Sequence, residues 1–157
     1  MKRYPIFFGP YGGLVAGNGF LARVSIRGKC LIEETGEDFV SILGVNPGAV
    51  AGDGANVGEA YHDFLANLRA LVFAIAETSP SFTAFDEEVR AAVWATNEPH
   101  AELWTEAVAK VRSGELDMEG VHRENAESEP VVEIHHVAPP DIRPELNEPE
   151  PHFEMAA

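Results

Sequence analysis

The sequence predicts an α+β fold in which a small antiparallel sheet, of about three to four strands, packs on one long helix and carries an inserted helical hairpin. Two patterns support this prediction. Residues 23–43 contain two stretches with the side-chain pattern of strands, and residues 57–77 place their apolar side chains along one helical stripe. With 157 residues, 45% of them hydrophobic, the chain is long enough for one domain with its own core.

The expected strands differ in how deeply they are buried. Residues 1–19 are rich in glycine, proline and aromatic residues, which favours an irregular or loosely strand-like segment over a helix. Residues 20–33 alternate between apolar and polar side chains, as a half-buried strand does, whereas residues 39–43 are typical of a strand buried on nearly both faces. Residues 131–137 have the composition of a short strand that closes the sheet.

The long helix is the best-defined element in the sequence. Asn56 followed by Glu59 forms a capping-box pattern, which predicts a helix that begins at Val57. The glycine-rich turn at residues 44–54 precedes it. The buried stripe is expected to contain Val57, Ala60, Phe64, Leu68, Leu71, Val72 and Ile75.

Two shorter helices are expected at residues 85–97 and 99–114, and the tight link between them indicates a helical hairpin. Trp94 and Trp104 would then pack between the two helices. The chain divides into residues 1–79 with the strands and main helix, residues 80–114 with the hairpin insertion, and residues 115–157. This last part contains an acidic linker, the closing strand and a proline-rich tail expected to be disordered or extended.

Charge limits the classes of partner. The formal net charge is −15, with 14 acidic and 9 basic residues in 1–114 and 12 acidic and 2 basic residues in 115–157. Such a chain is poorly suited to nucleic acid or an anionic membrane surface and better suited to a basic protein. No apolar run is long enough to span a bilayer, and the Pro- and Gly-interrupted residues 1–10 do not form a signal-peptide pattern. The single cysteine, Cys30, is expected to be a reduced structural thiol in a cytoplasmic protein.

No motif predicts catalysis, a cofactor or a metal. The loop from Gly52 to Gly58 lies between a strand and a helix, but it lacks a basic residue for a phosphate and contains Asp53, so we interpret its glycines as a backbone requirement. His135 and His136 are adjacent on a strand and would point to opposite faces. The serines have no nucleophile-elbow pattern, and the clustered carboxylates are typical of solvated faces.

The order of motifs in residues 39–77 resembles the HicB-like antitoxin family, whose members have a partial double-stranded-RNA-binding-like fold. The resemblance rests on residues 39–42, on Pro47-Gly48 followed by residues 49–51, on Gly52-Asp53-Gly54, and on Glu59-Ala60 opening the helix. Residues 131–137 would supply the closing strand. This chain departs from the family in the insertion at residues 85–114 and in lacking a visible DNA-binding tail after Val137.

The resemblance implies a non-catalytic protein that forms homo-oligomers and masks a small basic ribonuclease toxin. We expect Glu33, Glu34, Glu37 and Asp38, or the acidic tail, to bind such a partner. Two alternatives remain open at this stage. One is a structural domain in which Trp94 and Trp104 form an oligomer interface, and the other is a small enzyme with a cleft between hairpin and sheet, near residues 52–58.

Overall fold

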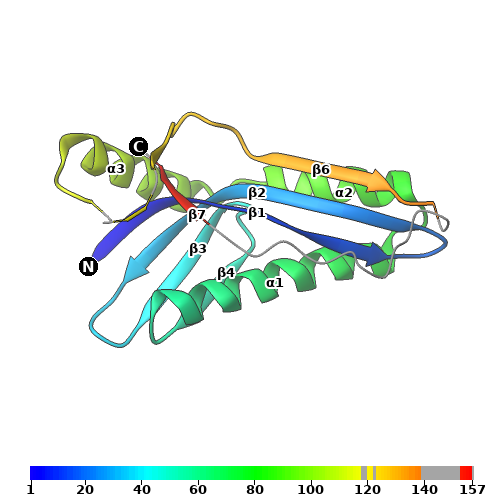
Figure 1. Ribbon diagram of the computed structural model, residues 1–157, viewed down its shortest axis with the longest axis horizontal. Helices are drawn as coiled ribbons and strands as arrows, with labels where there is room; N and C mark the ends of the chain where they lie inside the picture. Colours follow the sequence, from blue (N-terminus) through cyan, green and yellow to red (C-terminus); the bar gives the residue numbers. More distant parts are fainter. Residues whose placement is uncertain (118–119, 122, 139–152, 157) are drawn as a thin grey trace.

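The computed structural model describes residues 1–117, 120–121, 123–138 and 153–156 and shows an α+β fold with a seven-stranded mixed sheet and three helices (Figure 1). The elements in chain order are β1 (Lys2–Ala16), β2 (Leu21–Glu34), β3 (Val40–Asn46), β4 (Ala51–Gly54), α1 (Val57–Thr78), α2 (Phe82–Trp94), α3 (Glu98–Ser113), β5 (Arg123–Glu124), β6 (Val131–His136) and β7 (Phe153–Ala156).

Strand β2 organises the sheet. One of its edges pairs with β1 along most of its length, while the opposite edge pairs with β6 at residues 22–27 and with β3 at residues 29–34. The order across the sheet is β4-β3-β2-β1-β7-β5, with β6 beside β2. These pairings are antiparallel except that of β5 with β7, which is parallel. The chain passes from α2 to α3 near the point where β2 changes its partner from β6 to β3. There the linker residue Asn97 donates its backbone N–H to the carbonyl of Val45 in β3, 3.2 Å away.

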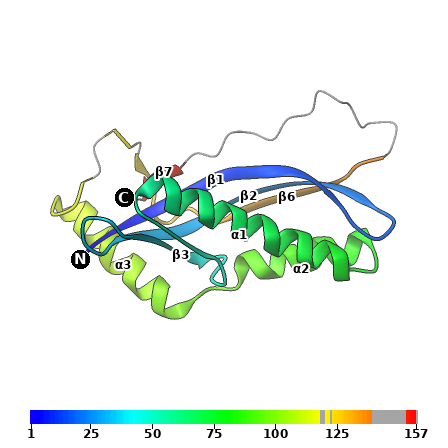
Figure 2. The same ribbon diagram turned by 90° about the horizontal axis from the view of Figure 1, so that it is seen from below.

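Successive residues of β1 point to opposite faces of the sheet and contact different helices. Phe8 meets Phe64 of α1 edge to face, with ring centroids 5.0 Å apart, and its neighbour Phe7 meets Trp104 of α3 at 5.8 Å. Helices α1 and α3 therefore lie on opposite sides of the strands at this end of the molecule (Figure 1). Helix α2 shares the main core with α1 and lies beside the end of α1 (Figure 2).

The expected boundaries of α1 and α3 are confirmed to within one residue, whereas α2 begins and ends three residues earlier than expected. The Asn56 side chain accepts a hydrogen bond from the Glu59 backbone N–H at 2.9 Å, so it caps α1. The Glu59 carboxylate reaches the backbone N–H of Ala55 at 3.0 Å, one residue earlier than in a standard capping box. Helix α3 ends at Gly114, whose φ of 81° places it in the left-handed conformation that glycine adopts readily.

The prediction of a small sheet on one long helix is wrong, and so is the prediction of a helical hairpin. Helix α2 packs on β2, β6 and α1, whereas α3 packs on β1, β2 and β3 across the sheet. Trp94 is consequently 49% exposed, while Trp104 lies in the second core beneath α3 and is only 8% exposed. The two tryptophans do not pack together, and Trp104 is not available to an oligomer interface.

The sheet is larger than expected because glycine-rich segments form strands. Residues 1–19 were expected to be irregular or loosely strand-like, and most of them form the 15-residue strand β1. A Cβ at Gly9 or Gly12 would lie 2.4 Å or 2.5 Å from a backbone carbonyl oxygen of β2, so the two glycines allow the strands to approach closely. Strand β4 forms within the expected glycine-rich turn, and β7 forms within the expected tail.

Candidate interaction site

The four acidic residues expected to bind a partner gather at one end of the molecule, where β2 turns into β3. Glu37 and Asp38 are exposed in the turn itself. Glu33 and Glu34 are the last two residues of β2, so their side chains point to opposite faces of the sheet. The structure therefore brings the four residues to one end without placing them all on one surface.

Glu33 and Glu34 have different surroundings. Glu33 accepts a hydrogen bond from Nε of Arg3 at 2.7 Å, and its side chain is only 17% exposed. Its charge is thus balanced within the molecule. Glu34 points to the face of Tyr4, and burial, followed by the charge of Glu34, raises the pKa of the Tyr4 hydroxyl. The carboxylates best placed for an external cation are those of Glu37 and Asp38.

A further carboxylate lies on the same face of the sheet as Glu33. The register aligns Glu33 with Ser41 of β3, and Ser41 with Asp53 of β4. The Ser41 hydroxyl donates to the carboxylate of Asp53 at 2.6 Å, and Asp53 remains exposed. Sequence reasoning considered Asp53 only as an obstacle to phosphate binding. Alternation along the two strands could have placed it opposite Ser41, but only once β4 was recognised as a strand.

The glycine loop is filled by the helix that follows it. A Cβ at Gly52 would lie 2.3 Å from the backbone nitrogen of Phe64, so α1 packs directly on the backbone of β4. The backbone N–H of Asp53 donates to the carboxylate of Asp63 at 2.9 Å, which uses a donor that a ligand would need. Close packing explains the need for glycine at Gly52 and Gly54, whereas a Cβ at Gly58 would meet only the Asn56 side chain, at 3.3 Å. The contact of α1 with β4 leaves the alternative of a cleft at residues 52–58 without a geometric basis.

Cys30, His100 and His136 occupy structural positions. Cys30 is fully buried, and burial raises the pKa of its thiol far above the usual range, which disfavours the reactive thiolate. His136 stacks on Phe82 with ring centroids 4.6 Å apart, and the ring of His100 lies 2.8 Å from the carbonyl oxygen of Gly44. Among the residues that the structure describes, no group of three or more histidine, cysteine or acidic side chains could hold a metal ion.

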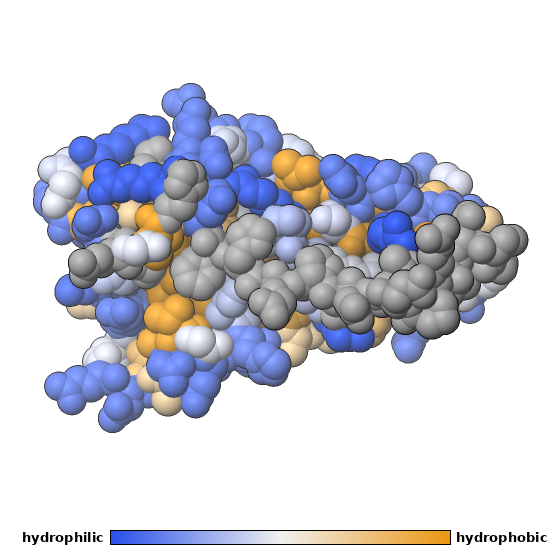
Figure 3. Space-filling model, viewed as in Figure 1, coloured by the Kyte–Doolittle hydropathy of each residue, from blue (hydrophilic) through white to orange (hydrophobic). Residues whose placement is uncertain are grey.

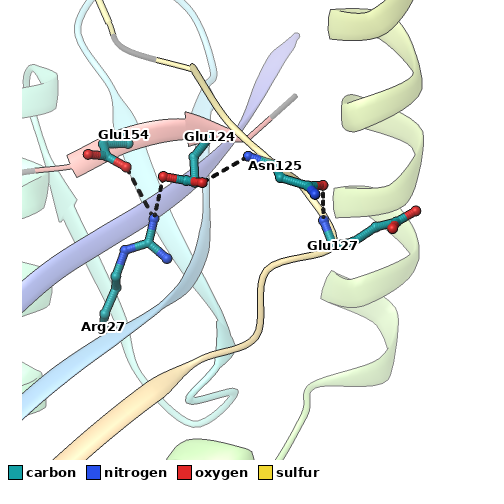
Figure 4. A network of polar contacts seen from close by, with 5 residues as sticks. All are labelled: Arg27, Glu124, Asn125, Glu127 and Glu154. Atoms are coloured by element: carbon teal, nitrogen blue, oxygen red, sulfur yellow. Dashed lines mark hydrogen bonds and ion pairs between the residues drawn. The ribbon is translucent and has the colours of Figure 1, made fainter.

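A second polar cluster joins the C-terminal strand to the sheet (Figure 4). The guanidinium of Arg27 lies 3.2 Å from the Glu154 carboxylate and 3.7 Å from that of Glu124, so one cation bridges β2, β7 and β5. The same guanidinium lies over the ring of Phe7, 4.5 Å from its centroid. The cluster is internally balanced, and we interpret it as a structural clamp on β7.

Replacing Arg27 by alanine should lower the free energy of unfolding by about 2 kcal/mol, because two part-buried carboxylates would lose their shared cation. Urea unfolding followed by circular dichroism measures this change. The control is Arg123→Ala, which removes a more exposed ion pair to Asp117 and should cost less than about 1 kcal/mol. Equal losses in the two variants would show that the Arg27 cluster is no stronger than a surface ion pair.

Comparisons with protein-family models, with curated proteins and with solved structures find no match to this chain. The likeness to HicB-like proteins therefore rests on the motifs of β3, β4 and α1. Over the described part of the chain, no helix combines the length and apolar character needed to cross a membrane.

Proposed function

We propose that this protein is a non-catalytic, antitoxin-like interaction protein that binds a small basic protein in the cytoplasm. The supporting observation is the order of elements from β3 to α1. Strand β3 leads through Pro47-Gly48 to β4, which contains Gly52-Asp53-Gly54 and leads to α1, and β6 pairs with β2 as a closing strand. This order is what the HicB-like resemblance implies.

The distribution of charge supports a basic partner. Four arginines are already held by carboxylates of the same chain, namely Arg3, Arg27, Arg90 and Arg123. Acidic side chains in contrast remain exposed on the turn after β2, on β4 and along α2. On the face seen in Figure 3, hydrophilic surface covers α3, while hydrophobic surface gathers over the strands at the left. A basic protein would be steered to the exposed acidic side chains.

The acidic end at Glu37 and Asp38 is the proposed contact for that partner. The turn between β2 and β3 is exposed and includes Phe39, which is 47% exposed and supplies apolar area beside the two carboxylates. A contact that combines a large apolar side chain with acidic neighbours suits a basic protein surface with an apolar centre. The buried thiol of Cys30 is consistent with a reducing compartment.

Charge reversal tests the proposal with a small basic protein encoded beside this chain as the probe. The double variant Glu37→Lys/Asp38→Lys should weaken binding at least about tenfold, which corresponds to about 1.4 kcal/mol, and should reduce the dependence of binding on salt. The matched control is Glu87→Lys/Glu88→Lys, an equal change of charge on the exposed face of α2. Isothermal titration calorimetry at two salt concentrations measures both effects. The absence of salt-sensitive association with any small basic protein from the same source would refute the proposal.

A further inference from the structure

Strand β6 forms a border of the sheet and has one edge turned away from β2 (Figure 1). The backbone N–H of Val137 donates to the carbonyl of Leu21 at 2.8 Å, which sets the alternation of the antiparallel ladder. Residues 131, 133 and 135 then face β2 with their backbone groups. The N–H and C=O groups of Val132, Ile134 and His136 face outward, where another strand could bind them.

Strand β4, which forms a border on the same side of β2, is treated differently. On β4, the Asn67 side chain donates to the carbonyl of Ala51 at 2.7 Å, and the Asp63 carboxylate accepts from the N–H of Asp53. Helix α1 thus covers the outward backbone groups of β4 with its own side chains, as proteins commonly do to prevent pairing at an edge.

The outward backbone groups of β6 have less cover. Arg90 of α2 donates to the carbonyl of Val132 at 2.8 Å and so covers one of these groups, but a carbonyl oxygen can accept a second hydrogen bond. The pairing of β6 with β2 runs without a bulge, and β6 contains no lysine or proline. These three means of preventing edge pairing are therefore missing from residues 131–136.

We propose that β6 pairs antiparallel with β6 of a second copy of this chain, about a two-fold axis through Ile134, so that the two sheets become continuous. This register aligns the outward groups of Val132, Ile134 and His136 with the same groups of the second copy. It also places Glu133 directly opposite His135 of the second copy, on an exposed face, and the symmetry repeats this pair.

The side chains of β6 select this register over its neighbours. Moving the axis by one residue toward Glu133 would set two Glu133 carboxylates opposite each other, and moving it toward His135 would set two His135 rings together. The proposed register also brings Val131, which is 46% exposed in the single chain, opposite Val137 of the second copy. At the centre the Glu133 carboxylate can accept a hydrogen bond from the imidazole N–H of His135, and valines meet at both ends, so one register is favoured.

Helix α2 is compatible with this pairing because it rests on both β2 and β6. A two-fold axis perpendicular to the sheet would place the α2 helices of the two copies on the same face, side by side. The side of α2 near β6 carries the ion pair of Arg90 with Asp86, in which Nε and Oδ1 are 2.9 Å apart. Two such helices in antiparallel orientation would present opposite charges to each other.

A charge-swap series tests the interface by sedimentation velocity of the purified protein alone. The unaltered chain should dimerise, and Glu133→Lys should weaken dimerisation at least about tenfold by placing a lysine opposite His135. His135→Glu should weaken it similarly by placing two carboxylates opposite each other. The double variant Glu133→Lys/His135→Glu should restore the dimer, because complementary charges face each other again. A monomer at about 100 µM, or a double variant weaker than both single variants, would overturn the proposal.

Proline substitution provides a second test that targets the backbone. His136→Pro removes an outward N–H that β2 does not use, so it should weaken the dimer while the monomer stays folded. The control is His136→Ala, which removes the stacking on Phe82 and retains the N–H. Equal dimerisation of the two variants would count against strand pairing. No basic partner takes part in either experiment, so the outcome is independent of the proposed function.

Discussion

Replacing Gly52 by alanine is expected to lower the free energy of unfolding by about 3 kcal/mol, near the upper end of the range for overpacking. The new Cβ would lie 2.3 Å from the backbone nitrogen and 2.6 Å from the Cα of Phe64. Both atoms belong to the backbone of α1, so the strain cannot be relieved by a side-chain rotation. The helix would have to move away from β4, and the contact between Phe64 and Phe8 would open.

Urea unfolding monitored by circular dichroism measures this loss, and Gly58→Ala is the matched control. Gly58 lies in the first turn of α1, where a Cβ would meet only the Asn56 side chain oxygen, at 3.3 Å. Alanine favours a helix over glycine by up to about 1 kcal/mol, which offsets a small shift of that cap. We expect the free energy of unfolding of Gly58→Ala to stay within about 1 kcal/mol of that of the unaltered protein. Similar midpoints for the two variants would mean that α1 does not rest on β4 as closely as the structure shows.

Helix α1 could be predicted from the sequence because its signals are local. The cap at Asn56 and the apolar stripe both act within a few turns, and the structure buries most of the expected stripe. The sheet could not be predicted to the same extent, because β1 depends on β2 to accept its glycines at close range. Propensity alone counts glycine and proline against a strand, and long-range pairing overrides it here.

The arrangement of α2 and α3 illustrates a different limit. Both helices were expected from the sequence, but a short link between helices predicts an antiparallel hairpin only if both have the same surface to cover. Here the link crosses an edge of the sheet beside Asn46, whose side chain donates to the Thr96 hydroxyl at 2.8 Å. The second core beneath α3 makes this crossing favourable, and no local pattern in the sequence reveals that second core.

The sequence indicates where the acidic residues of the candidate site lie, but not all of the contacts that they make. Acidic residues around the turn after β2 could be recognised directly from the sequence. Their division between two faces follows from the period of two once β2 is known to extend to Glu34. The pairing of Glu33 with Arg3 could not be foreseen, because the sequence did not indicate that residues 2–16 pair with β2.

The two tryptophans should respond very differently to replacement, with the larger effect at Trp104. Trp104→Ala is expected to lower the free energy of unfolding by about 3 to 5 kcal/mol, because it empties the core between α3 and Phe7. Trp94→Ala removes a side chain that is 49% exposed and should cost about 0.5 kcal/mol. Urea unfolding of the two variants distinguishes the observed arrangement from a hairpin that buries both tryptophans, since such a hairpin would make the two losses similar.

Trp104→Phe separates the contribution of ring packing from that of the indole N–H. Nε1 of Trp104 is buried and has no hydrogen-bond partner in the described part of the chain, so its removal breaks no hydrogen bond and relieves an unsatisfied donor. The smaller ring would weaken the contact with Lys29, whose Nζ lies 4.8 Å from the ring centroid. These effects oppose each other, and we expect the free energy of unfolding of Trp104→Phe to lie within about 1 kcal/mol of that of the unaltered protein. A loss as large as that of Trp104→Ala would instead mean that the indole N–H has a partner, so that α3 is held by a specific polar contact as well as by apolar packing.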